Sequence, residues 1–257
     1  MSFNKFNEQG FIEEFRVEVG NKLKNLQEKI YFLTKDLIVE HDSNLNIIEK
    51  LNLPFKFIPE NEVWSKIMNE VNNSQELSDI IENEGVINSF KKIFKDPVRF
   101  PISTFRARFP NQKRVLYNWH QDEGTWFVSK DANLQKKLSG TLWFSINGSN
   151  ENDSIQMVKF SHKKKLFNHK YIKGQGYFSA ELDNQIDDNL IYTVKTKESE
   201  AVLFHPLTLH RSVAQDDKKI NMRPRYSIDI RYFDNNVVLD YNTNIIFKLK
   251  KYLKNLW

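Results

Sequence analysis

The chain has 257 residues, of which 40% are hydrophobic and 28% are charged, a balance typical of soluble globular proteins. It contains no cysteine, which excludes disulfide bridges and thiolate metal ligands and leaves only histidine, aspartate and glutamate for a transition metal. No run approaches the roughly 18 apolar residues of a membrane span, and no secretory signal is visible, so we expect a cytoplasmic protein.

The formal net charge of +5 could indicate a nucleic-acid-binding protein. However, the lysines are scattered and the basic runs are short, which favours a solvated lysine-rich surface. An attraction for anionic small molecules stays open. We therefore predict a small-molecule substrate and neither a nucleic-acid nor a membrane partner, in a protein that is a monomer or a homodimer.

Residues 1–98 have the pattern of a mainly helical segment. Apolar residues recur at three- and four-residue spacing from Phe11 to Val39, which predicts an amphipathic helix that Gly20 weakens or breaks. Two further helices are predicted from Glu62 to Val71 and from Gln75 to Phe94.

Residues 99–240 have a different pattern, in which short aromatic and branched runs alternate with turn signals such as "NGSNENDS". Helices followed by strands predict an α+β protein, and without a linker we expect one domain over residues 1–257. The last segment, residues 241–257, predicts a basic amphipathic helix that packs on the strands or on a dimer partner. The predicted strands are Phe100–Phe109, Arg114–Trp119, Gly140–Ile146, Ile155–Phe160, Ile191–Lys195, Ala201–Phe204 and Arg225–Phe233.

The last predicted strand, "RYSIDIRYF", alternates polar and apolar side chains. Its polar face carries Arg225, Ser227, Asp229 and Arg231. Such a face is either exposed to solvent or, in a barrel that holds a polar ligand, lines the cavity.

The stretch "LYNWHQDEGTWF" places His120 and Asp122 two residues apart, and on a strand these side chains would project from one face. A third ligand is available from "AVLFHPLTLHRS", which contains His205 and His210. Two histidines and one carboxylate form the facial triad of Fe(II) oxygenases. Their 2-oxoacid cosubstrate has a distal carboxylate that the planar fork of an arginine such as Arg225 matches.

Four stretches together resemble the phytanoyl-CoA dioxygenase family of Fe(II)- and 2-oxoglutarate-dependent oxygenases: "WHQDEGTWF", "IQMVKFSHK", "AVLFHPLTLHRS" and "RPRYSIDIRYF". The first is most similar to the ectoine-hydroxylase-like branch, whereas Lys159 and Phe160 replace the Pro-Gly that is usual in the second. The resemblance implies a double-stranded β-helix, a cupin-like jelly roll, packed against N-terminal helices.

The resemblance also implies roles for individual residues. The expected Fe(II) ligands and catalytic residues are His120, Asp122 and His210. The expected 2-oxoglutarate contacts are Arg225, Ser212, Trp143 and, more weakly, Thr104. Trp126 would line the substrate cavity, although both tryptophans could simply be core and Ser212 could bond only backbone. Arg106 and Arg108 share a face with Thr104 and could bind a substrate carboxylate or phosphate, or be exposed.

The implied reaction consumes 2-oxoglutarate and O2 and releases succinate and carbon dioxide while it hydroxylates an unactivated C–H bond of a small polar metabolite. The carboxylate Asp122, which related halogenases lack, favours hydroxylation. Residues 173–189 would help to cover the active site. Two alternatives stay open: a non-catalytic jelly-roll binding protein, and an oxygenase that acts on a macromolecule.

Overall fold

The computed structural model describes residues 3–39, 44–57, 59–100, 103–108, 117–126, 137–164, 166–172, 177–182, 185–213 and 223–238. Its α-helices are α1 (Phe3–Gln9), α2 (Asn21–Thr34), α3 (Ile47–Leu51), α4 (Asn61–Asn72), α5 (Gln75–Ile81), α6 (Glu84–Lys91) and α7 (Asp122–Trp126). Its strands are β1 (Phe11–Arg16), β2 (Pro97–Arg99), β3 (Thr104–Arg108), β4 (Lys137–Ser145), β5 (Ile155–Val158), β6 (His169–Ile172), β7 (Tyr177–Ala180), β8 (Ile191–Thr193), β9 (Glu200–Phe204), β10 (His210–Ser212) and β11 (Arg225–Val238). Three short 3-10 helices complete it: η1 (Lys35–Leu37), η4 (Ser161–Lys163) and η5 (Asp188–Leu190).

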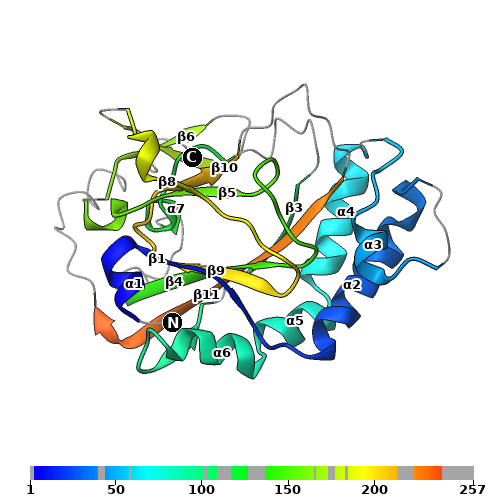
Figure 1. Cartoon of the computed structure of the whole chain (residues 1–257), viewed down its shortest axis with the longest axis horizontal. Helices are drawn as coiled ribbons and strands as arrows, with labels where there is room; N and C mark the ends of the chain where they lie inside the picture. Colours follow the sequence, from blue (N-terminus) through cyan, green and yellow to red (C-terminus); the bar gives the residue numbers. More distant parts are fainter. Residues whose placement is uncertain are drawn as a thin grey trace, which may run out of the picture.

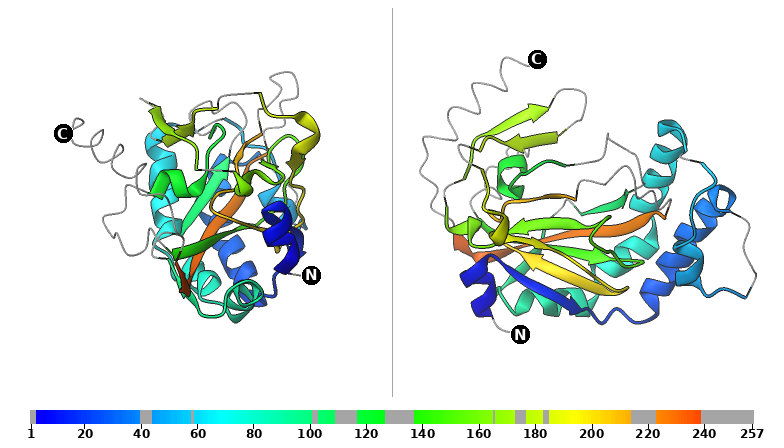
Figure 2. Two further views of the ribbon diagram at one scale, coloured as in Figure 1. Left: turned by 90° about the vertical axis from the view of Figure 1, so that its left-hand side faces the viewer. Right: turned by 45° about the horizontal axis from the view of Figure 1, so that its top comes forward.

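A six-stranded antiparallel sheet forms the centre of the molecule, with the order β1-β9-β4-β11-β2 and with β3 also paired to β11. A three-stranded sheet, β10-β5-β8, lies across one of its faces, and helices α2 to α6 lie along the opposite side (Figure 1, Figure 2). The hairpin β6-β7 forms a third, separate sheet. The predicted α+β class, a jelly roll packed against N-terminal helices, is confirmed.

Alternation along the central strands separates two environments. On β4, Leu142 and Phe144 pack into a cluster with helical residues such as Leu26 and Val71. The residue between them, Trp143, packs instead with Met157 and other residues of the smaller sheet. The helix-facing side is therefore the main hydrophobic core, and the other side faces the space between the sheets.

The predicted long helix from Phe11 to Val39 is wrong in its first part, because residues 11–16 form strand β1 and pair with β9. The six residues "FIEEFR" bury Phe11, Ile12 and Phe15, a spacing that fits a helix as well as an irregular edge strand. Gly20 separates strand from helix: its φ of 58° lies in the left-handed region that glycine adopts readily.

The predicted helix from Gln75 to Phe94 is two helices, because Asn83 interrupts it and its side chain caps α6 by accepting from the Gly85 N–H at 2.8 Å. The helix predicted from Glu62 to Val71 is confirmed as α4. The strand predicted from Arg114 to Trp119 is not confirmed: residues 117–119 are not in a strand, and the rest of that range lies outside the described residues.

Two predictions about the organisation of the chain are not tested by the structure. The C-terminal helix over residues 241–257 lies outside the described residues, and the single domain over residues 1–257 stays a prediction. No helix in the described part of the chain has the length and apolar character needed to cross a bilayer. The cytoplasmic location, the monomeric or homodimeric state and the absence of membrane and nucleic-acid partners stay predictions.

Candidate metal centre

The backbones of two histidines hold each other in place. His120 and His210 form an isolated antiparallel bridge, in which each N–H donates to the carbonyl of the other at 2.9 Å. Nδ1 of His120 lies 2.7 Å from the Asn118 carbonyl, and Nδ1 of His210 lies 2.9 Å from that of Thr208. Because a carbonyl only accepts, each Nδ1 carries the proton and each Nε2 presents a lone pair suited to a metal.

Asp122 does not lie on a strand, as the sequence suggested, but begins helix α7. The expected shared strand face is therefore wrong, although the side chains do converge. Asp122 Oδ1 lies 3.8 Å from His210 Nε2, and the three ligand atoms lie within 4.8 Å of one another. Exposed fractions of 8%, 2% and 6% for His120, Asp122 and His210 show that the group is buried. Two imidazole nitrogens and one carboxylate oxygen are the donor set of the Fe(II) facial triad, so these residues fit Fe(II).

The second oxygen of Asp122 is held by two residues that the sequence analysis did not single out as ligand partners. Its Oδ2 accepts a hydrogen bond from the Thr141 hydroxyl and another from Arg231 Nε at 3.3 Å. Thr141 and Arg231 are direct register partners on β4 and β11, so both side chains leave the sheet at one point.

Charge at the triad favours metal binding. Burial alone would raise the pKa of the Asp122 carboxyl, but the Arg231 guanidinium and the hydrogen bond from Thr141 outweigh it and hold that pKa well below its usual value. Burial and then the neighbouring His210 hold the pKa of His120 well below its usual value. The site therefore presents an ionised carboxylate and a neutral His120 imidazole, the protonation states that ligate a metal.

The residue between the first two ligands is also fixed. The Gln121 N–H donates to His169 Nε2 at 3.0 Å, and its side-chain amide donates to the Leu207 carbonyl at 2.9 Å and accepts from the Phe167 N–H at 2.8 Å. Burial lowers the pKa of His169 to about 4, which keeps its ring neutral and able to accept. A Cβ at Gly124 would lie 2.1 Å from the His169 ring, so a side chain there would displace this support.

The triad forms part of the wall of a cavity of about 270 Å³ between the two sheets. The polar side chains of Arg225, Asp229 and Arg231 line it, which decides between the two alternatives for the polar face of β11 in favour of a cavity. Four other residues named from the sequence also line it, Ser212, Trp143, Arg106 and Arg108, and so does Arg211, which was not singled out. Residues that the sequence analysis missed line it as well: Tyr117, Thr125, Phe178 and Phe204.

Two expected site residues, Thr104 and Trp126, are not placed in the cavity lining by the structure, and two further histidines lie away from the triad. Thr104 is not among the lining residues and pairs with Asp229 in the β3–β11 ladder. Trp126 ends helix α7, but its side chain lies outside the described part of the structure. His162 Nε2 lies 2.8 Å from the Asn7 carbonyl oxygen. The His205 ring packs on the Phe6 ring, with 5.4 Å between the ring centroids. Among the described residues, the group that could hold a metal ion contains neither histidine.

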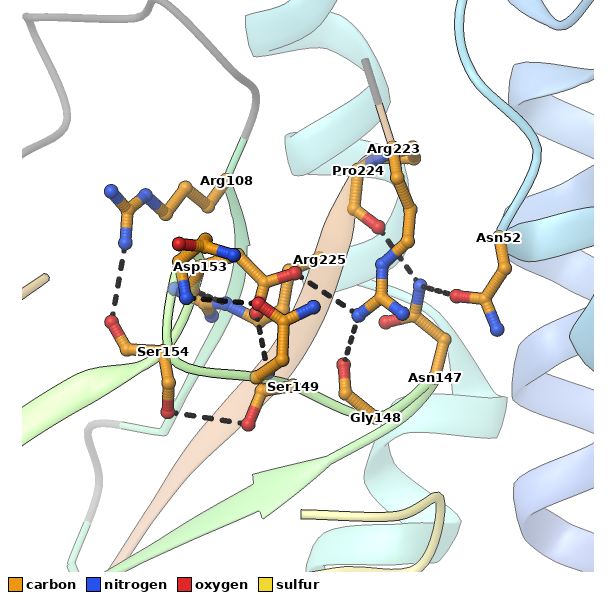
Figure 3. Close-up of polar contacts among 12 residues, drawn as sticks. Asn52, Arg108, Asn147, Gly148, Ser149, Asp153, Ser154, Arg223, Pro224 and Arg225 are labelled. Atoms are coloured by element: carbon orange, nitrogen blue, oxygen red, sulfur yellow. Dashed lines mark hydrogen bonds and ion pairs between the residues drawn. The ribbon is translucent and has the colours of Figure 1, made fainter. Parts of the chain in front are cut away.

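Arg225 is buried at the start of β11, close to the turn that joins β4 to β5 (Figure 3). Its Nε donates to the Asp153 carbonyl at 3.1 Å, its Nη1 donates to the Ser227 hydroxyl, and its guanidinium lies 5.2 Å from the centre of the Trp143 ring. The Asn147 side chain bonds both neighbours of Arg225, the Pro224 carbonyl at 2.9 Å and the Tyr226 N–H at 2.8 Å. These hydrogen bonds fix the start of β11 and thereby the position of Arg225 beside the cavity.

A buried two-histidine, one-carboxylate triad at the wall of a jelly-roll cavity defines the class of non-haem iron oxygenases. The family model for phytanoyl-CoA dioxygenase (PhyH) matches residues 57–220, more than half of the chain. The chain belongs to the phytanoyl-CoA dioxygenase family, as the motifs predicted. It is an Fe(II)- and 2-oxoglutarate-dependent oxygenase that uses O2.

Solved structures with the same fold include the non-haem monooxygenase ThoJ, at 16% identity and a TM-score of 0.56, with 91% of this chain and 77% of that chain covered. EvdO2 from Micromonospora carbonacea var. aurantiaca is similar at 12% identity and a TM-score of 0.56, with 94% and 92% covered. The carbocyclase SnoK from nogalamycin biosynthesis is similar at 12% identity and a TM-score of 0.51, with 96% and 89% covered. No curated protein sequence matches the chain. At these identities the structural likeness shows the fold alone.

The triad predicts the metal stoichiometry. We expect the purified protein to bind one Fe(II) per chain, and Asp122→Ala or His210→Ala to lose tight binding because either change removes one of three ligand atoms. Iron content after anaerobic loading and gel filtration measures this. His205→Ala is the control and should retain iron. Stoichiometric iron in either ligand variant would remove that residue from the metal site.

The contacts of Asp122 Oδ2 predict a second effect. Arg231→Met removes the guanidinium that orients and ionises Asp122, and partners of this kind contribute about 10- to 100-fold to metal affinity. Titration with Co(II) should show a loss of metal affinity in that range for Arg231→Met and a smaller loss for Thr141→Val. The matched control is Arg211→Met, which removes an arginine that contacts no ligand. Unchanged or tighter binding by Arg231→Met would mean that repulsion between guanidinium and metal outweighs orientation.

Proposed function

We propose that this oxygenase hydroxylates an unactivated C–H bond of a small polar metabolite, with succinate and carbon dioxide as coproducts. The observation that carries the proposal is the position of the buried triad in a cavity between the sheets that five arginines help to line. A volume of about 270 Å³ is near the lower end of small-molecule sites, roughly 300 Å³ and above, which supports a small substrate over a macromolecule.

The cosubstrate side of the cavity is assigned to Arg225, Trp143 and Ser212. Arg225 is buried, cationic and lines the cavity, as a charge-assisted partner of the distal carboxylate of 2-oxoglutarate needs to be. Trp143 provides a flat apolar wall beside it. Ser212 accepts from the Tyr117 N–H at 3.3 Å and keeps its own hydroxyl proton to donate. Thr104 lies outside the lining, so the assignment does not use it.

The substrate side is assigned to Arg106, with Trp126 as a further candidate at the end of α7. The Arg106 side chain is 31% exposed, so it lies nearer the mouth than the buried arginines. Its Nε lies 3.1 Å from Asp229 Oδ2, and its Nη1 donates to the Tyr117 hydroxyl. These two partners would orient it toward a carboxylate or phosphate of the substrate. Phe178 on β7 lines the cavity, which supports a covering role for the described residues 177–182 and 185–189 of the segment 173–189, the rest of which lies outside the described residues.

A bound Fe(II) would supply the activation of O2, the step that protein side chains cannot perform. The described residues contribute everything else. Arg225 and Trp143 would orient the cosubstrate, and Arg231 and Thr141 hold Asp122 ionised with Oδ1 directed at the ligand group. The burial of the triad would help to shield the reacting atoms from water.

Measurement of succinate formation tests the activity. We expect the Fe(II)-loaded protein to convert 2-oxoglutarate slowly to succinate, to lose this activity without iron, and to increase it when a pool of small carboxylates and phosphates contains the substrate. A protein that binds iron and 2-oxoglutarate but forms no succinate with any pool would be a non-catalytic binding protein. Stimulation by single-stranded nucleic acid that weakens with salt would indicate a macromolecular substrate.

Arg225→Ala should raise the KM for 2-oxoglutarate by roughly two orders of magnitude or more, because a lost charge-assisted pair costs about 2–5 kcal/mol when its partner stays buried. Iron content should stay unchanged, since Arg225 contacts no metal ligand. The matched control is Arg223→Ala: this arginine binds the Gly148 carbonyl at 2.7 Å and Asp153 Oδ2 at 3.1 Å and does not line the cavity. If Arg223→Ala has the larger effect on KM, the assignment of Arg225 is wrong.

A further inference from the structure

A second arginine lies directly beside Arg225. Arg108 ends β3 and Arg225 begins β11, and the two are register partners in the antiparallel β3–β11 ladder. Their neighbours Ala107 and Tyr226 pack in the main core, so both arginine side chains project from the opposite face, and both line the cavity. Residues directly opposite each other on one face of a sheet are close enough to interact.

Both arginines are buried, with exposed fractions of 3% for Arg108 and 5% for Arg225. Among the described residues neither makes an ion pair, and their partners are neutral oxygens. Arg108 Nη1 donates to the Ser154 carbonyl at 3.2 Å and Nη2 donates to the Val213 carbonyl, whereas its Nε is buried without a hydrogen-bond partner among these residues. Figure 3 shows both side chains reaching one turn, at the consecutive residues Asp153 and Ser154.

Nearby carboxylates are already paired with other cations. Asp153 Oδ2 lies 3.1 Å from Arg223, and Asp229 Oδ2 lies 3.1 Å from Arg106. Burial is the main cause that lowers the pKa of Arg225 to about 10, and the charge of Arg108 is the next. Two like charges side by side in a buried site are unfavourable unless an anion joins them.

We propose that Arg108 and Arg225 form a paired-guanidinium site that holds the distal carboxylate of 2-oxoglutarate between them. This assigns Arg108 to the cosubstrate, whereas the sequence alone made it a candidate for the substrate. The inference rests on the proposed cosubstrate role of Arg225. The two oxygens of one carboxylate can each accept from a different guanidinium, and the unpartnered Nε of Arg108 is a donor available for this. The pair would thereby select dicarboxylic over monocarboxylic 2-oxoacids.

The test compares two ligands that differ only at the distal end. 2-Oxopentanoate has the same 2-oxoacid head and chain length as 2-oxoglutarate but ends in a methyl group. Calorimetric titration of the anaerobic Fe(II)-loaded protein gives the dissociation constant of each. We expect Arg108→Gln to weaken 2-oxoglutarate about 10- to 100-fold, the range for a lost hydrogen bond to a charged group, and to leave 2-oxopentanoate unchanged. Arg108→Lys keeps the charge but not the planar fork, so it should weaken 2-oxoglutarate less than Arg108→Gln does.

Arg223→Gln is the matched control, because Arg223 binds the same turn without lining the cavity, and it should weaken 2-oxoglutarate far less than Arg108→Gln does. The proposal is overturned if Arg108→Gln weakens both ligands equally, which is the result of a structural role. It is also overturned if neither ligand is affected while Arg225→Gln still weakens 2-oxoglutarate. Failure of the wild-type protein to bind 2-oxoglutarate is a distinct result and overturns the proposed function itself.

Discussion

The backbone bridge between His120 and His210 is the constraint on which the site depends. Two reciprocal hydrogen bonds of 2.9 Å join segments that are ninety residues apart in the chain, and they place two imidazoles with centroids 4.1 Å apart. The short turn from His120 into α7 then places the Asp122 carboxylate beside the two imidazoles. The donor set is therefore preorganised by main-chain pairing, which is insensitive to the side chains around it, while Thr141 and Arg231 set the orientation and charge of the carboxylate.

The same sheet serves stability on one face and chemistry on the other. Along β11, Tyr226, Ile228 and Ile230 enter the core that the helices cover, and Arg225, Asp229 and Arg231 face the cavity. A shift of one residue in register would exchange these sets, exposing apolar side chains to the cavity and burying arginines in the core. The cost of such an exchange fixes the register, and the register in turn positions every charged group of the site.

Residue patterns predicted much of this site and missed the parts that depend on tertiary pairing. The alternation in "RYSIDIRYF" predicted which side chains share a face, and the motifs predicted the triad. The contact between Arg231 and Asp122 was not predictable, because it depends on Arg231 lying opposite Thr141 in the sheet. Strand β1 was assigned to a helix because six residues with irregular apolar spacing fit both periods. Asp122 was placed on a strand because local spacing carries no information about where a bridge ends and a helix begins.

The strand order also sets when the site can form during synthesis. Phe11, near the beginning of the chain, pairs with Phe204, and β11 pairs with β4, β3 and β2, all made earlier. Contacts between distant segments form slowly because long loops must close first. The apolar faces of the early strands and helices would therefore stay uncovered until β9 to β11 have left the ribosome. Conditions that slow this last step would therefore be expected to limit the yield of folded protein.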